Sequence, residues 1–192
     1  MRTNLPVSNK EAHLRDDSLI VSKTDLKGRI TYVNKDFLEI SGFSEAELIG
    51  EPHNIVRHPD MPPEAFADLW ETLKAGRPWT GMVKNRCKNG DHYWVVANVT
   101  PIVESSRITG YMSVRRKPTR SQVDAAEELY RKFRENRQGK LRIRYGQAVQ
   151  GGGRLLDRLT MRQRMMLIFG FICAVLVAQA LIGVTALWTI ND

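Results

Sequence analysis

Apolar and polar positions in the first half of the chain follow two patterns, one typical of strands and the other of helices. Residues 19–34, LIVSKTDLKGRITYVN, are rich in β-branched residues around a Lys-Gly turn, which predicts a hairpin. Residues 36–50, DFLEISGFSEAELIG, predict two short helices separated by Gly42, and Ser44 and Glu47 have the spacing of a capping box. Residues 62–76, PPEAFADLWETLKAG, place apolar side chains at helical spacing and predict a helix with one buried face.

Three further strands are predicted after these helices. Residues 81–88, GMVKNRCK, and 91–103, DHYWVVANVTPIV, flank the dipeptide Asn89-Gly90, a strong hairpin signal, and residues 108–117 form the third strand. Two strands, a block of short helices and three strands are typical of an α+β fold, with a five-stranded antiparallel sheet and helices on one face. We expect this domain to span residues 19–117, with residues 1–18 as an N-terminal cap.

The second half of the chain predicts a linker and a membrane span. Residues 119–138 have helical periodicity, Gly139 interrupts it, and three glycines at 151–153 form a hinge, so that residues 118–164 are expected to be a basic helical linker. Residues 165–188, MMLIFGFICAVLVAQALIGVTALW, contain no charged residue. As a helix this stretch would be about 36 Å long, enough to cross a hydrocarbon core of about 30 Å. We predict a transmembrane helix followed by a tail, residues 189–192.

The net charge of +8 is concentrated in the predicted linker. Residues 115–164 carry 15 Lys and Arg against 5 Asp and Glu, whereas residues 1–114 carry 14 against 15. A basic segment beside an apolar span favours the cytoplasmic side of the inner membrane and binds anionic lipid headgroups. Membrane lipid is therefore the expected partner of this segment, and nucleic acid is not. The two cysteines, Cys87 and Cys173, lie in the fold and in the span and fit a reducing cytoplasm.

The segment RHPDMP, residues 57–62, allows two interpretations that are compatible with each other. In the first, Asp60 caps the following helix, with Pro62 and Pro63 in its first turn. In the second, Arg57 and His58 bind an anionic phosphate group, because a forked guanidinium and free N–H groups at a helix start are suitable donors.

The motifs PHNIVRHPDMP, AFADLWETLKAGRPWTGMVKNRCKNGDHYWVVANVTPI and GYMSVR resemble the flavin-binding PAS domain of the aerotaxis receptor family, over roughly residues 19–116. The resemblance implies a PAS fold, a bound FAD and a non-catalytic redox sensor of oxygen or energy status. It also implies a homodimer and signalling to a chemotaxis kinase and adaptor through regions that this sequence does not include.

The resemblance also implies cofactor-binding roles. Arg57, His58 and Asp60 would hold the diphosphate and ribose of FAD. Asn85 and Asn98 would hydrogen-bond the edge of the isoalloxazine, although a structural amide bonded to backbone is the alternative for each.

Four other residues are weaker candidates for cofactor contact. Each has a structural alternative in a turn or in the core, and they are Trp79, Tyr93, Asn34 and His53. His53 lies on or near the position where blue-light receptors of the LOV type carry their reactive cysteine, so photoadduct chemistry is not expected.

The sequence offers no nucleophile–base pair and no cluster with metal-ligand spacing, so we expect neither an enzyme nor a metal site. Two alternatives to a flavin sensor stay open. One is a cofactor-free PAS domain that serves as an interaction or dimerisation module. The other is a haem-based gas sensor in which His53 or His58 is the axial ligand.

Overall fold

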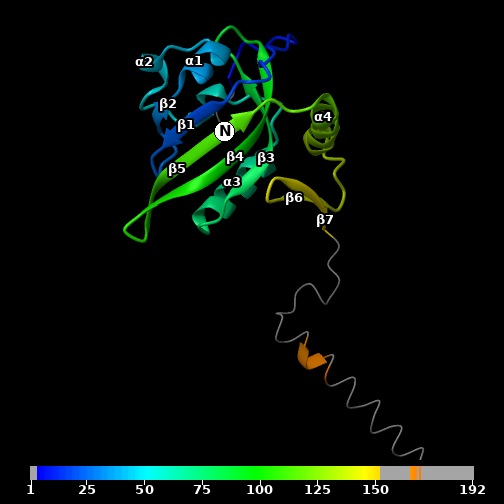
Figure 1. Ribbon diagram of the computed structural model, residues 1–192. Coiled ribbons are helices and arrows are strands. Elements are labelled where there is room, and N and C mark those ends of the chain that lie inside the picture. Colours follow the sequence, from blue (N-terminus) through cyan, green and yellow to red (C-terminus); the bar gives the residue numbers. More distant parts are fainter. Residues whose placement is uncertain (1–3, 152–164, 168, 170–192) are drawn as a thin grey trace, which may run out of the picture. The chain divides into compact units, whose positions relative to one another are not determined.

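The computed structural model of the chain describes residues 4–151, 165–167 and 169 (Figure 1). The chain divides into two compact units, residues 1–150 and 151–192, and the strands and helices below all belong to the first. Most of the predicted transmembrane helix, 165–188, and the whole tail, 189–192, lie outside the described residues. No helix within the described ranges is both long enough and apolar enough to cross a membrane.

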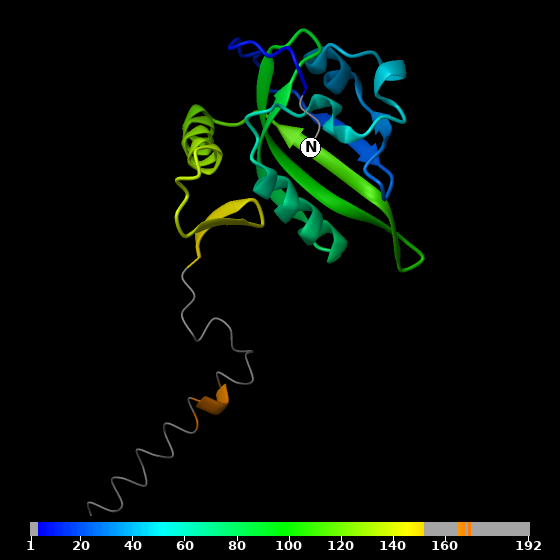
Figure 2. The same cartoon turned by 180° about the vertical axis from the view of Figure 1, so that it is seen from behind.

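A five-stranded antiparallel sheet forms the centre of the first unit (Figure 2). Its strands are β1 (Ile20–Thr24), β2 (Ile30–Val33), β3 (Trp79–Arg86), β4 (His92–Glu104) and β5 (Arg107–Arg116). They are ordered β2-β1-β5-β4-β3, so β5 lies between the two hairpins predicted from the sequence and pairs with β1 on one side and β4 on the other. At the predicted Asn89-Gly90 turn, Gly90 has a φ of 98°, a conformation that glycine adopts without strain.

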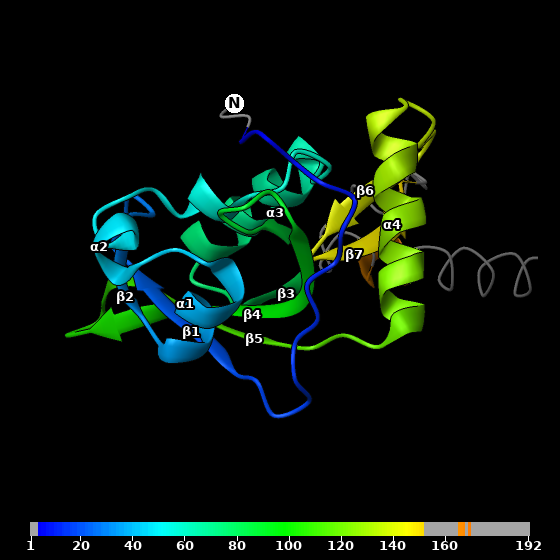
Figure 3. The same cartoon turned by 90° about the horizontal axis from the view of Figure 1, so that it is seen from above.

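Four short helices cover one face of this sheet, which we call the inner face (Figure 3). They are α1 (Lys35–Ser41), α2 (Glu45–Leu48), the 3₁₀ helix η1 (His53–Val56) and α3 (Pro63–Lys74). Gly42 ends α1 with a φ of 70°, and Ser44 and Glu47 form the predicted capping box at the start of α2. The predicted α+β fold, with an antiparallel sheet and short helices on one face, is therefore confirmed.

The predicted cap of α3 is wrong. Asp60 was expected to cap this helix, but α3 begins at Pro63, the N-cap position is Pro62, and no side chain caps it. The N-cap residue is a proline, which has no side-chain oxygen to accept from the N–H groups of the first turn. The Asp60 carboxylate instead accepts a hydrogen bond from Lys84 Nζ at 2.6 Å.

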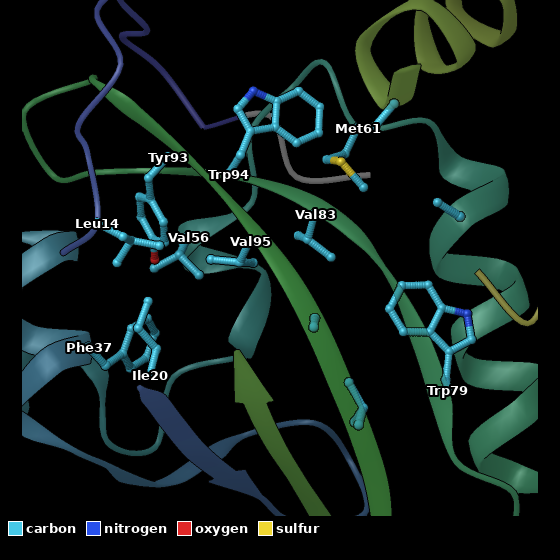
Figure 4. Packing of buried hydrophobic residues seen from close by; sticks show 14 of the residues in the cluster. Leu14, Ile20, Phe37, Val56, Met61, Trp79, Val83, Tyr93, Trp94 and Val95 are labelled. Atoms are coloured by element: carbon cyan, nitrogen blue, oxygen red, sulfur yellow. The ribbon is translucent and has the colours of Figure 1, made fainter. Parts of the chain in front are cut away.

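The hydrophobic core lies between the helices and the inner face of the sheet (Figure 4). Ile20 on β1, Phe37 on α1 and Val56 on η1 are completely buried together with Tyr93 and Val95 on β4. These side chains come from segments that are distant in the sequence, so their burial holds the helices against the sheet.

The predicted linker differs from the structure in its first part. Residues 120–134 form α4 (Arg120–Arg134), which ends earlier than the predicted helix 119–138, and Thr119 begins it with a capping box. Helix α4 packs on the outer face of β3 and β4, where the ring of Tyr130 stacks on Trp94 and its hydroxyl donates to the Met82 carbonyl at 2.6 Å.

A hairpin that the sequence analysis did not predict follows α4. It consists of β6 (Leu141–Arg144) and β7 (Gln147–Gln150), and its turn residues Tyr145 and Gly146 have φ angles of 52° and 75°. Two consecutive positive φ angles are typical of a type I′ turn. Both turn N–H groups donate to the carboxylate of Asp68 on α3, at 2.9 and 2.7 Å. The compact unit therefore extends to Gln150.

We expect Gly146→Ala to loosen this hairpin. A Cβ at Gly146 would collide with the carbonyl oxygen of Thr80, and it would also strain a positive φ. Gly76→Ala is a matched control, because Gly76 has a φ of 73° and open space around the added Cβ. Urea unfolding should show a loss of about 1–2 kcal/mol for the control and at least about 1 kcal/mol more for Gly146→Ala. Equal losses would contradict the docking of the hairpin.

Candidate functional site

A cavity of about 310 Å³ lies between α3, η1 and the inner face of the sheet. One wall is apolar and includes Phe66, Leu69 and Trp70 of α3, and the sheet contributes Val83 and Val99. The ring of Trp70 packs edge-on against Tyr111 with 5.5 Å between centroids. The volume is at the lower end of the range of about 300–1,000 Å³ that is usual for ligand pockets.

The sheet side of the cavity also carries polar side chains without protein partners. Three residues that line the cavity, Asn85, Ser113 and Arg115, each have a buried atom (Nδ2, Oγ and Nη1) with no hydrogen-bond partner within the described part of the protein. A buried polar group without a partner costs about 1–3 kcal/mol, and most such groups in proteins are therefore bonded. Three of them around one cavity indicate a site for a ligand with a hydrogen-bonding edge.

Arg57 is the cation of the RHPDMP segment that lines the cavity. Its Nη2 donates to the Met61 carbonyl at 3.0 Å, and its guanidinium lies 3.9 Å from the centre of the Phe66 ring. Burial lowers the pKa of Arg57 to about 10, so the side chain stays charged at neutral pH. The carbonyl of Arg57 accepts a hydrogen bond from Asn4 Nδ2 at 2.9 Å, which ties this segment to the N-terminal cap.

His58 and Asp60 do not line the cavity. Asp60 pairs with Lys84, and its carbonyl accepts from Arg134 Nη1 of α4 at 2.7 Å. The buried His58 ring packs edge-on against His92, with 5.7 Å between centroids. The structure thus divides the predicted three-residue site, with Arg57 on the cavity and the other two residues facing Lys84, His92 and α4.

The two asparagines lie on opposite faces of the sheet. Asn85 is buried and pairs with Tyr93 across the strands, whereas Asn98 pairs with Thr80. Residues at even and odd positions of a strand point to opposite faces, so Asn98 lies on the outer face. It is exposed and accepts a hydrogen bond from Thr80 Oγ1 at 2.8 Å. The expectation that both asparagines contact one ring is therefore corrected in favour of Asn85.

Three of the weaker candidates occupy structural positions away from the cavity lining. Trp79 is buried, and its Nε1 donates to Asp68 Oδ2 at 2.7 Å. Tyr93 is fully buried, and burial raises the pKa of its hydroxyl. Asn34 caps α1, and its amide also donates to the Leu19 carbonyl at 2.6 Å and accepts from the Val21 N–H at 2.9 Å.

His53, the fourth weaker candidate, lines the cavity beside a residue that the sequence analysis missed. Its Nε2 is 2.7 Å from Arg115 Nη2 and 3.3 Å from Ser22 Oγ. Burial and the charge of Arg115 lower the pKa of His53 to about 3, so its imidazole is neutral and Nε2 accepts the hydrogen bond from Arg115. The sequence analysis counted Arg115 only with the excess of basic residues in 115–164 and gave it no role at the site, although alternation with Tyr111 and Ser113 along β5 places it on the inner face.

Comparison with known protein families agrees with this architecture. Residues 30–115 match the family described as the PAS fold. The light-state structure of the blue-light photoreceptor Aureochrome1 LOV has a TM-score of 0.51 with this chain at 20% identity, covering 56% of this chain and 90% of that one. At this identity the likeness shows the fold alone.

The chain is also similar to the aerotaxis receptor of Escherichia coli (strain K12), with 50% identity over 146 residues. This match confirms the resemblance that the sequence motifs indicated, and it covers 76% of this chain and 29% of that receptor. The nitrogen fixation regulatory protein of Klebsiella pneumoniae is 29% identical over 100 residues, which are 52% of this chain and 20% of that protein. The chain thus spans less than a third of the length of either relative.

The buried histidines predict a loss of stability in mild acid. Burial is the main cause that lowers the pKa of His53 to about 3 and of His58 to about 4, from 6.5 in the unfolded chain. The unfolded chain therefore binds more protons than the folded protein between about pH 6.5 and 4, and the free energy of unfolding should fall as the pH falls through this window. Each histidine contributes a slope of up to about 1.4 kcal/mol per pH unit.

Urea unfolding at several pH values checks this prediction. His58→Gln should reduce the slope between pH 6.5 and 4.5, whatever its effect on stability at pH 7. His13→Gln is the control, because His13 is exposed and should leave the slope unchanged. Equal slopes for wild type and His58→Gln would show that His58 is not buried as a neutral group.

Proposed function

We propose that this chain is the sensing part of a membrane-tethered redox sensor for aerotaxis, and that its PAS cavity binds FAD. The oxidation state of the flavin would report oxygen or respiratory status to a chemotaxis kinase and adaptor. The observation that carries this proposal is that three residues lining the cavity, Asn85, Ser113 and Arg115, have unpaired buried polar atoms, while α3 lines the same cavity with apolar side chains. The similarity to the aerotaxis receptor supports the same assignment.

The residues present fit a flavin. The pyrimidine edge of an isoalloxazine alternates carbonyl and N–H groups, and the amide of Asn85 can both donate to and accept from such an edge. Phe66, Leu69 and Trp70 offer apolar contact to the ring. A cavity of about 310 Å³ suits the ring system better than the whole dinucleotide. Arg57 remains at the cavity and is the cation that we assign to the diphosphate. When bound, the flavin would supply the electron chemistry, and these residues would bind and orient it.

The alternatives fit the site less well. A LOV-type photoadduct needs a cysteine at the ring, and the residues that line the cavity include none; Cys87 lies elsewhere and donates to the Ile40 carbonyl at 3.2 Å. An axial haem ligand needs a free imidazole nitrogen on the cavity. His53 Nε2 is bonded to Arg115, and His58 faces away from the cavity. A cofactor-free interaction module does not explain why buried donors surround a cavity.

The cellular setting is part of the same proposal. The apolar stretch 165–188 and the basic segment before it support an inner-membrane anchor, lipid contact and a cytoplasmic PAS domain, with no role for nucleic acid. A homodimer is proposed from the family resemblance. We propose a sensor without catalytic activity of its own.

The decisive experiment identifies the chromophore. The full chain is purified in detergent, its visible spectrum is recorded, and the compound released by heating is identified by chromatography. We expect an oxidised flavin spectrum and FAD in near-stoichiometric amount. A Soret band would support the haem sensor, and a colourless protein that does not take up added FAD would support the interaction module.

The two asparagines offer a matched pair of variants for the site. Asn85→Leu should remove a hydrogen-bonding group at the ring and lower FAD affinity by about tenfold or more, because each lost bond to a buried partner costs about 1–3 kcal/mol. Asn98→Leu should leave the affinity unchanged, since Asn98 is on the outer face. Flavin fluorescence titrations of the two variants measure the difference. Equal affinities would contradict the assignment of Asn85.

A further inference from the structure

Arg115 is a buried cation with no carboxylate partner in the described part of the protein. Its side chain is 5% exposed, and its strand neighbours at the same level are Ile20 on β1 and Ala97 on β4. Burial lowers the pKa of Arg115 to about 10, so the guanidinium remains charged at neutral pH. The inner face of the sheet therefore carries a positive charge that no acidic side chain among the described residues balances.

The contacts of Arg115 satisfy only part of its hydrogen-bonding capacity. Nη2 donates to Ser22 Oγ at 3.1 Å and to His53 Nε2 at 2.7 Å, and both acceptors are neutral. The guanidinium also lies 5.5 Å from the centre of the Phe37 ring. Nη1 has no partner within the described residues, and Arg115 is among the residues that line the cavity.

An unbalanced buried charge is among the most costly features in a protein interior. Buried charges in proteins are usually paired, and Arg115 lines a cavity in which a ligand can supply the paired charge. Since Ser22 and His53 hold the other nitrogen in place, the unpaired donor is fixed in position for a ligand group. The missing counter-charge is therefore expected on the ligand.

We propose that Arg115 makes this cavity selective for a ligand whose negative charge lies next to the inner face of the sheet. This inference rests on the proposed function, in which the ligand is a flavin. An oxidised flavin ring is neutral. Addition of two electrons and one proton, with dithionite as the electron donor in the test below, gives a reduced ring with one negative charge. Arg115 interacts with this charge only in the reduced state, so the site binds reduced flavin more tightly and raises the midpoint potential of the bound flavin.

Three variants of the full chain in detergent test the effect on potential. Arg115→Gln removes the charge, Arg115→Lys retains it, and Arg116→Gln is the control, because Arg116 is the exposed neighbour on the same strand. Dithionite titration of the FAD-loaded proteins against a reference dye gives each midpoint potential. We expect Arg115→Gln to reduce the ratio of the affinities for reduced and oxidised flavin by at least tenfold. This change lowers the midpoint potential by about 30 mV or more. Arg115→Lys should keep most of the wild-type potential, and Arg116→Gln all of it.

A second measurement separates charge balance from a structural role. In flavin-free protein, urea unfolding should show Arg115→Gln to be at least as stable as Arg115→Lys, because a buried charge without a partner lowers the free energy of unfolding. In protein loaded with reduced FAD the order should invert, because the lysine charge then has a partner. Equal potentials for the Gln and Lys variants, or the same stability order with and without flavin, would overturn the proposal.

The two measurements also distinguish this inference from the proposed function. If the wild-type chain takes up no flavin, the proposed function fails, and the flavin-free unfolding of the two Arg115 variants still decides whether the charge is unbalanced. If flavin binds but its potential does not depend on the charge at position 115, only the inference about Arg115 fails.

Discussion

The alternation of side chains along β3 is the constraint on which the site depends. Val83 and Asn85 face the cavity, and Lys84 between them faces α4. The RHPDMP segment runs along the free edge of this strand, where Arg57 forms a bridge with Asn85 and the His58 N–H donates to the Lys84 carbonyl at 3.3 Å. The segment therefore behaves as a short additional strand, and its consecutive side chains point to opposite faces. This explains why Arg57 reaches the cavity and His58 does not.

The outer face of β3 is covered as well, by Asp60, Trp94 and helix α4. Lys84 is buried between the carboxylate of Asp60, at 2.6 Å, and the ring of Trp94, with 5.8 Å to the ring centre. Helix α4 rests on the same strand through the bond from Tyr130 to the Met82 carbonyl. A single strand thus forms part of the cavity wall on one side and supports the helix that leads toward the C-terminal unit on the other.

The sequence predicts the fold well because the relevant signals are local. The hairpins, the capping box at Ser44 and Glu47 and the amphipathic α3 each depend on residues within a few positions of one another. The hairpin 141–150 was missed because its strands carry many charged and polar residues, so the turn signal at Tyr145-Gly146 was the only strong one.

The site is predicted less completely, because it depends on pairing between distant strands. Whether Asn98 faces the cavity is decided by its register with Thr80, which no local pattern of the sequence determines. Arg115 looks like the first of a series of basic linker residues, and only its place on β5 beside β1 and β4 shows that it is enclosed. His58 and Asp60 adjoin Arg57 in sequence, but the edge of β3 separates them in space.

The contacts of Asn4 have a consequence for the order of assembly. Its amide bonds to the carbonyls of Asn54 and Arg57, and the residues after it lie along the turn between β3 and β4. Residues 4–12 can therefore reach their final place only after the residues up to His92 have been synthesised and folded. This segment closes the domain late, so a change within it also affects the backbone that positions Arg57.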